Sequence, residues 1–346
     1  MAQSLISLGA NLGNPRQLMQ LAGKMILDRF GTSNVTFSRL YRTPAVGGPT
    51  GQDDFYNAVA KIESSNTAFE IWRSLHEIEQ LLGRRRRHRW EARRIDLDVL
   101  LHAGERHWTP TLKIPHPRML MRTFVLEPAC EIASDWIEPV TGQTIAGLSQ
   151  MLQQSRANEQ LGIAAIHILV LSESEQRIQR IAQSLIEPTH DSISNHDKAT
   201  LVDSTKVRST EDSKQTVVRM SRSRRITLQS VDPQSRTISQ TLIEATRRQL
   251  NYQIVDYEKE LPLQLLVFAG ASPDPEAIHW EDYCRSWAEL FELSPTNQDT
   301  NERNAFRRLP KYLLSADDPV WAAHELQAAM TAMTCPIEAS GAFFDD

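Results

Sequence analysis

The 346-residue sequence lacks three features that mark specialised classes of protein. It contains no run of about 18 apolar residues, so we expect no transmembrane helix. Its first residues carry neither the basic start nor the long apolar core of a signal peptide. Its three cysteines, Cys130, Cys284 and Cys335, are odd in number and far apart, which argues against a disulfide framework and a zinc site. These absences predict a cytoplasmic globular protein that has no membrane partner.

The sequence also lacks the excess of positive charge that is typical of nucleic-acid-binding proteins. Its formal net charge is -5, and 40% of its residues are hydrophobic. A chain that is acidic overall is repelled by phosphate backbones, so we expect no nucleic-acid partner. The length favours two domains, each large enough to bury a core.

Residues 1–155 alternate between strand and helix patterns. Apolar residues at helical spacing follow Pro15, which suits a first helical turn, and precede Gly83, which suits a helix C-terminus. The predicted helices are 15–30 and 66–82, and the predicted strands are 4–8, 35–43, 55–63 and 94–101. The order β-α-β-β-α-β predicts an α+β domain, a ferredoxin-like sandwich with helices on one face of the sheet.

Residues 163–346 have a different pattern, which predicts a second, smaller α/β domain. Residues 187–239 are rich in polar and charged side chains and nearly free of aromatic ones, so we expect a polar, flexible insertion there. The remaining pattern predicts strands at 163–171 and 263–268 and helices at 175–185, 240–250, 277–290 and 319–333.

The most informative motif is a strand pattern that carries two carboxylates, Asp96 and Asp98. Because strand side chains alternate between faces, these two point the same way, about 6 to 7 Å apart. An arginine-rich stretch, residues 83–94, leads directly into the strand. A lone Asp-x-Asp is more simply explained as a solvated strand edge. Carboxylates that can hold magnesium beside arginines that can bind phosphate instead predict a phosphoryl-transfer site.

Five clusters in the first domain carry a family resemblance. They are Gly9-Ala10-Asn11; Tyr41 to Pro44 with Phe55 to Ala58; Glu79 with Gly83-Arg84-x-Arg86; Arg89-Trp90 to Asp98; and Ile114 to Arg118 with Arg122 to Leu126. In this order and spacing they resemble the 6-hydroxymethyl-7,8-dihydropterin pyrophosphokinases, over about residues 3–150. The resemblance implies transfer of pyrophosphate from ATP to the pterin alcohol, giving AMP and the pterin pyrophosphate, in folate biosynthesis. It also implies two Mg²⁺ ions and possible association with other folate-pathway enzymes.

The resemblance assigns a role to each matching residue. A pterin is flat and polar, so its site needs aromatic faces and hydrogen-bonding partners at the ring edge. The implied pterin-binding residues are Thr43, Pro44, Val46, Phe55, Asn57, Trp90 and Phe124. The implied ATP-binding residues are Glu79, Arg86, Arg89, His116 and Arg122. The implied catalytic residues are Asp96, Asp98, Arg84 and Arg93, with the two aspartates as the metal ligands.

The sequence departs from the family pattern in three places. Ala10 stands where the family commonly has Ser, which predicts the loss of one hydroxyl near the substrate. Glu91-Ala92 replaces Gly-Pro, and the loop 46–52 is about one residue longer than usual. Two other interpretations remain: a catalytically weakened scaffold that binds pterin or nucleotide, and a nucleic-acid binder that uses the arginine loop.

The second half weakly resembles deoxynucleoside kinases. However, the acidic stretch Ser172-Glu173-Ser174-Glu175 stands where a phosphate-binding loop would be glycine-rich and basic. We therefore expect a degenerate relative or an unrelated domain. On this interpretation, a chain ending after about Gln150 should still fold and be active.

Overall fold

The computed structural model describes residues 1–49, 51–84, 92–109, 111–162, 166–172, 174–186, 208–210, 213–221, 223–230, 263–270 and 308–344. The chain forms two compact units. Unit 1 consists of Met1–Gln153 together with Thr331–Asp346, and unit 2 is Gln154–Met330. In the described part of the chain, no helix is long and apolar enough to cross a membrane.

Unit 1 is built on an antiparallel sheet in the order β14-β3-β4-β1-β5, with β2 also paired to β4. The strands are β1 (Ala2–Ala10), β2 (Val35–Phe37), β3 (Tyr41–Thr43), β4 (Phe55–Ser64), β5 (Asp96–His102) and β14 (Glu338–Ala339). A separate two-stranded sheet pairs β6 (His107–Trp108) with β7 (Lys113–Ile114).

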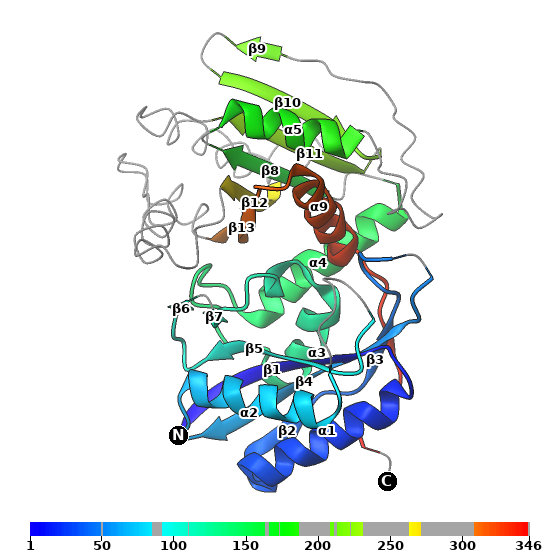
Figure 1. Cartoon of the computed structure of the whole chain (residues 1–346), viewed down its shortest axis with the longest axis vertical. Helices are drawn as coiled ribbons and strands as arrows, with labels where there is room; N and C mark the ends of the chain where they lie inside the picture. Colours follow the sequence, from blue (N-terminus) through cyan, green and yellow to red (C-terminus); the bar gives the residue numbers. More distant parts are fainter. Residues whose placement is uncertain are drawn as a thin grey trace. The chain divides into compact units, whose positions relative to one another are not determined.

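The two faces of this sheet have different roles. Helices α1 (Pro15–Phe30) and α2 (Ala68–Leu81) cover one face, and α3 (Thr123–Ala133) lies on the other (Figure 1). The core cluster beneath α1 and α2 takes its residues from even-numbered positions of β1 and β4, such as Ile6, Leu8, Ala58 and Ala60. The odd-numbered side chains of the same strands therefore point toward α3. Helix α4 (Ile145–Gln160) follows α3 along the chain.

Local capping explains where the helices begin. The Asn14 side chain accepts a hydrogen bond from the backbone of Gln17, and helix α1 spans the predicted residues. Helix α2 starts two residues later than predicted, because Thr67 and Glu70 form a capping box at its N-terminus. The strand predicted at 35–43 is divided into β2 and β3. Between them, the Ser38 hydroxyl accepts a hydrogen bond from the backbone N–H of Val59.

Unit 2 contains a second six-stranded sheet in the order β13-β12-β8-β11-β10-β9. Its strands are β8 (Ile166–Ser172), β9 (Arg208–Thr210), β10 (Ser213–Arg219), β11 (Arg224–Ser230), β12 (Leu263–Gly270) and β13 (Lys311–Ser315). Strands β13, β12, β8 and β11 are parallel neighbours. Helix α5 (Glu175–Ile186) follows β8 along the chain, and helix α9 (Pro319–Met333) follows β13. The helices predicted at 240–250 and 277–290 lie outside the described residues.

The prediction of a flexible insertion at 187–239 is wrong for residues 213–219 and 224–230, which form β10 and β11. Strand β11 pairs along its whole length with β8, and its Ile226 and Leu228 side chains are fully buried. Polar residues alternate with these apolar ones, so the average composition concealed a strand. Unit 2 is also not the smaller of the two units.

The predicted boundary at residue 155 also needs correction. Residues 331–346 belong to unit 1 and not to the second domain. Strand β14, which lies in this segment, pairs with β3 at the edge of the first sheet. A chain that ends after Gln150 therefore lacks part of unit 1.

The buried strand β11 generates a stability prediction. We expect Leu228→Ala to lower the free energy of unfolding by about 2–5 kcal/mol, because it removes fully buried methyl groups and leaves a cavity. Leu161→Ala is the matched control, since that leucine is 75% exposed and its loss should change stability by about 0.5 kcal/mol or less. Urea unfolding of the full chain measures both. Equal effects of the two substitutions would show that β11 is not part of a packed core.

Candidate active site

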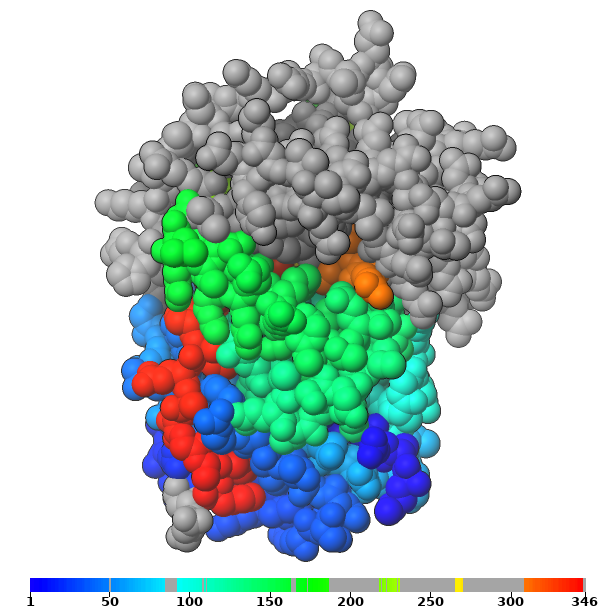
Figure 2. Space-filling view, turned by 180° about the vertical axis from the view of Figure 1, so that it is seen from behind, coloured from blue at the N-terminus to red at the C-terminus, as the bar shows by residue number. Residues whose placement is uncertain are grey.

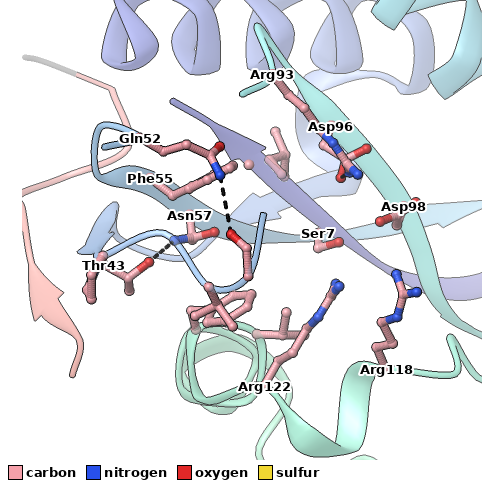
Figure 3. A pocket seen from close by; sticks show the side chains of 17 residues that line it. Ser7, Thr43, Gln52, Phe55, Asn57, Arg93, Asp96, Asp98, Arg118 and Arg122 are labelled. Carbon is pink, nitrogen blue, oxygen red and sulfur yellow. Dashed lines mark hydrogen bonds and ion pairs between the residues drawn. The ribbon is translucent and has the colours of Figure 1, made fainter. Parts of the chain in front are cut away.

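A pocket opens on the face of the first sheet that α3 covers (Figure 3). Its lining comes from β1, β3, β4, β5, the start of α3 and the loop before β4. Ten of the predicted site residues line it, namely Thr43, Pro44, Val46, Phe55, Asn57, Arg93, Asp96, Asp98, Arg122 and Phe124. The structure thus brings together residues that are up to 81 positions apart in the sequence.

Strand register explains why these side chains meet. Asp96 lies opposite Gly9 of β1, which lies opposite Asn57 of β4. Two residues earlier in β1, Ser7 lies opposite Asp98. Cross-strand neighbours point to the same face of a sheet, so this row places the carboxylates of β5 and the amide of β4 in one pocket. Gly9 supplies no side chain between them.

Ala10 points the other way. It belongs to the core cluster under α1 and α2 and is fully buried. The expectation that Ala10 removes a hydroxyl near the substrate is therefore wrong, because position 10 faces the core and not the pocket.

The two carboxylates of β5 have different electrostatic surroundings. Asp96 forms ion pairs with Arg93 and with Arg84, whose Nη2 lies 2.6 Å from Oδ1. Partial burial disfavours the charge of Asp96, but Arg93 and Arg84 outweigh it and hold its pKa below the ordinary value. Burial and the neighbouring charge of Asp96 raise the pKa of Asp98 to about 6. The two carboxylates therefore repel each other, and Asp98 releases its proton less readily than Asp96.

Glu79 lies beneath the acidic pair and does not line the pocket. Its side chain is only 2% exposed and forms an ion pair with Arg84. The same carboxylate accepts the backbone N–H of Leu97 at 2.7 Å, and Leu97 is the residue between the two aspartates. A hydrogen bond also joins its second oxygen to His76 at 3.2 Å. The geometry makes Glu79 a support for β5, whereas the resemblance implied contact with ATP.

His116 and two arginines border the acidic pair on the side of α3. His116 Nε2 lies 3.8 Å from Asp98 Oδ2, and its Nδ1 accepts the backbone N–H of Arg118. Burial, Arg122 and Arg118 hold the pKa of His116 well below its ordinary value, so the ring is neutral. With Nδ1 accepting, its proton lies on Nε2 and faces Asp98. Burial and then Arg118 lower the pKa of Arg122 to about 10.

The other end of the pocket is less charged. The Asn57 amide donates to the Thr43 hydroxyl at 2.9 Å, which links β4 to β3. The guanidinium of Arg122 lies over the Phe124 ring at 5.6 Å. Gln52 donates to the Gly47 carbonyl at 3.2 Å and so closes the loop before β4 (Figure 3). Aromatic rings, a held amide and backbone groups suit a flat, polar ligand.

Some predicted residues cannot be compared with the structure, and some lining residues were not predicted. Arg86, Arg89 and Trp90 lie outside the described residues. Ser7, Gln52 and Arg118 line the pocket without a role assigned from the sequence. Ser7 could have been found, because it shares the face of Gly9 by strand alternation. Gln52 lies in an irregular loop whose path has no such period.

Asn11 also escaped assignment, although it holds the start of β5. Its amide oxygen accepts the backbone N–H of Arg93 at 2.7 Å, and its amide nitrogen donates to the Asp53 carbonyl at 3.2 Å. This buried side chain therefore joins the end of β1 to the segments that carry Arg93 and Gln52.

The donor set of the pocket fits a magnesium ion. Asp96 and Asp98 offer hard carboxylate oxygens on one face, and their mutual repulsion is what a divalent cation relieves. Among the described residues, no group of three or more acidic, histidine or cysteine side chains forms a complete metal cage. Magnesium commonly takes one or two carboxylates and completes its shell with water and phosphate oxygens.

Carboxylates and guanidinium groups in one pocket are the components of a phosphoryl-transfer site. Comparison with known proteins agrees with this class. Residues 5–134 match the family model described as 7,8-dihydro-6-hydroxymethylpterin-pyrophosphokinase (HPPK).

Curated relatives carry the same description. A 2-amino-4-hydroxy-6-hydroxymethyldihydropteridine pyrophosphokinase of Haemophilus influenzae is 40% identical over 139 residues, which cover 40% of this chain and 86% of the relative. The enzyme of that name from Bacillus subtilis is 37% identical over 127 residues, 37% of this chain and 75% of the relative. A crystal structure of Plasmodium falciparum HPPK-DHPS covers 94% of this chain and 80% of that one, at 12% identity and a TM-score of 0.36.

The chain belongs to the HPPK family. The family match ends within unit 1, and the deoxynucleoside-kinase resemblance of the second half has no support from these relatives.

The buried ion pair under β5 generates a prediction. We expect Glu79→Ala to lower the free energy of unfolding by about 3 kcal/mol or more, because it strips a partner from buried Arg84 and an acceptor from Leu97. Glu77→Ala on the same helix is the control, since its ion pair with Arg29 is solvent-exposed and should contribute less than about 1 kcal/mol. Denaturant unfolding of the two variants compares them. A loss for Glu79→Ala no larger than the control would contradict the supporting role.

Proposed function

We propose that the pocket of unit 1 is the site where this chain transfers pyrophosphate from ATP to 6-hydroxymethyl-7,8-dihydropterin, giving AMP and the pterin pyrophosphate. Membership of the HPPK family carries the reaction. The observation that locates it is the single pocket that holds Asp96 and Asp98, three arginines, and the Asn57 amide. This reaction belongs to folate biosynthesis.

In this proposal the pterin binds at the end formed by β3, β4 and the start of α3. Asn57 is fixed by Thr43 and directs its remaining hydrogen-bonding groups to the ring edge. Phe55 and Phe124 supply the apolar faces, and Pro44 and Val46 the wall beside them. An amide held in one orientation discriminates among ring edges better than a mobile one, because its donors and acceptors are already placed.

The phosphates bind at the other end, among the arginines. Arg93 and Arg122 line the pocket, and Arg84 and His116 lie directly behind its acidic pair. Guanidinium groups bind phosphate oxygens bidentately and neutralise the charge that an attacking alcohol must approach. Neutral His116 keeps a donor for a phosphate oxygen. Arg86, Arg89 and Trp90 belong to the same proposal by family resemblance.

Asp96 and Asp98 would hold Mg²⁺. An ion held there would supply positive charge that neutralises the phosphates and favours ionisation of the attacking hydroxyl. The chain itself positions the two ends, so that the pterin hydroxymethyl oxygen faces the β-phosphorus and displaces AMP. Partial burial of the pair limits the competing access of water.

Four broader expectations accompany this function. The strand order β3-β4-β1-β5 supports a ferredoxin-like sandwich for unit 1, and the parallel strands of unit 2 support an α/β domain. A cytoplasmic location and association with other folate-pathway enzymes remain predictions, the latter in line with a relative named folic acid synthesis protein fol1 from Pneumocystis carinii.

The test of the reaction is direct. The purified full chain should form AMP from ATP only when the pterin alcohol and magnesium are both present, and a chelator should stop the reaction, because the donor set suits a hard dication. AMP and the pterin product are measured by chromatography. A folded sample that forms no AMP with both substrates and excess magnesium would refute the proposal.

Neutralising either aspartate should separate turnover from pterin binding. We expect Asp96→Asn and Asp98→Asn each to lower turnover about 10²- to 10³-fold, the usual cost of removing one electrostatic element of a transition state. Pterin affinity, measured by fluorescence titration, should stay nearly unchanged because the ring binds at the other end. Asp28→Asn on the exposed side of α1 is the control. Near-normal turnover of either variant would exclude that aspartate from the reaction.

A further inference from the structure

The C-terminal segment, residues 331–344, is bound to the two elements that form the pterin end of the pocket. It adds a strand to β3, with Glu338 opposite Arg42 and Ala339 opposite Tyr41. The pairing continues past the strand, because Ser340 N donates to Leu40 O at 2.7 Å and Leu40 N donates to Gly341 O at 3.0 Å. At Tyr41 and Arg42, strand β3 therefore has a partner on each side, β4 on one and this segment on the other.

A phenylalanine anchors the end of this segment in the core of unit 1. Phe343 is 4% exposed and belongs to the core cluster beneath α1. Its ring stacks on Phe37, with the centroids 4.2 Å apart, and meets Phe344 edge-on. Arg16 donates to Ser340 O at 2.8 Å from the same helix. Figure 2 shows the segment, in red, lying along the surface of the N-terminal residues, in blue.

Gly23 shows that α1 is shaped to receive this anchor. Glycine inside a helix is normally less favourable than alanine. A Cβ at position 23 would lie closer to Phe343 Cε1 than real Cβ atoms approach, and it would make a tight contact of 3.0 Å with Phe344 Cζ. All three of its nearest atoms belong to the C-terminal segment. Because Gly23 has no side chain, the rings of Phe343 and Phe344 can pack directly against α1 at this position.

A second attachment lies at the start of α3. The buried hydroxyl of Thr123 is within hydrogen-bond distance of two carbonyls of the segment, Ala332 O at 3.2 Å and Cys335 O at 3.0 Å. Arg122 and Phe124, on either side of Thr123, both line the pocket. The segment therefore holds α3 at the point where that helix enters the site.

We propose that the C-terminal segment is a positioning element of the pyrophosphokinase site, which sets the distance between β3 and α3 and so the width of the pterin end. Thr43 and Pro44 stand on or next to one of these elements, and Arg122 and Phe124 on the other. The inference rests on the proposed function of this pocket. It assigns a catalytic consequence to residues that follow the whole of unit 2 in the sequence.

A double-mutant cycle in the full chain tests whether the segment is seated on α1. Gly23→Ala alone should lower the melting temperature of unit 1, because the new methyl group displaces Phe343. In a Phe343→Ala background the same change should raise it by about 2–4 °C, the gain that helix propensity then gives. In a Phe69→Ala background, where the lost ring is half-exposed on α2, Gly23→Ala should remain destabilising. The same sign in both the wild-type and Phe343→Ala backgrounds would overturn the seating.

A second pair of variants tests the effect on the pocket. Thr123→Val keeps the shape of the side chain but leaves two buried carbonyls without this donor, whereas Thr123→Ser keeps the hydroxyl. We expect Thr123→Val to raise the KM for the pterin about fivefold or more. The KM for ATP should rise less, because of the proposed phosphate-binding arginines only Arg122 adjoins Thr123, while Arg84 and Arg93 stand on other segments. Thr123→Ser should keep both values within about threefold. An unchanged pterin KM, or equal changes for both substrates, would overturn the positioning role.

Failure of the proposed function and failure of the positioning role would give different experimental results. Failure of the proposed function would appear as no AMP formation by the unsubstituted chain, while the sign reversal of Gly23→Ala would still hold. Failure of the positioning role would appear in an active enzyme. Gly23→Ala would then change the melting temperature equally with and without Phe343, or Thr123→Val would leave the KM for the pterin unchanged.

Discussion

The pocket depends on one buried carboxylate, Glu79, which holds the strand that carries Asp96 and Asp98. It accepts the backbone N–H of Leu97, between Asp96 and Asp98, and its ion pair with Arg84 is continued from Arg84 to Asp96. An unpaired charge at this depth would be costly, so Glu79 and Asp96 each need the positive charge of Arg84. The same arginines that neutralise Asp96 are the donors that a polyphosphate would recruit. In the proposed function, Arg84 and Arg93 are thus already held at Asp96 before a phosphate binds.

The sheet separates stability from chemistry by the alternation of its strands. Even-numbered residues of β1 and β4 pack under α1 and α2, while odd-numbered residues such as Ser7, Gly9 and Asn57 face the pocket. This division is why Ala10, one residue from a pocket-lining glycine, belongs to the core. A shift of β1 by one residue would move its core residues to the pocket face and its pocket residues to the core. The burial of the core residues therefore also fixes which side chains of β1 face the pocket.

Sequence reasoning succeeded where the cause is local and periodic. The shared face of Asp96 and Asp98 follows from strand alternation, and the bounds of α1 follow from Pro15 and helical spacing. It did not foresee the hydrogen bond from Leu97 to Glu79, because no local pattern shows that a helix carboxylate will accept from the backbone of a later strand. It failed for β11 because composition was averaged over a segment in which Ile226 and Leu228 alternate with polar residues. The family resemblance supplied what physics alone could not, the identity of the ligands.

The C-terminal segment returns to unit 1 through contacts between residues that are far apart in the sequence. Local sequence patterns therefore could not predict this return. Arg16 and Ser340 are 324 positions apart, with all of unit 2 between them. Such a separation adds little to the thermodynamic cost of closure, because each doubling of loop length adds only about 0.6 kcal/mol. The effect on folding order is larger, since distant contacts form late. Unit 1 cannot acquire the outer partner of β3 until residues 338–341 have been made, so this edge of the sheet depends on a segment that follows all of unit 2.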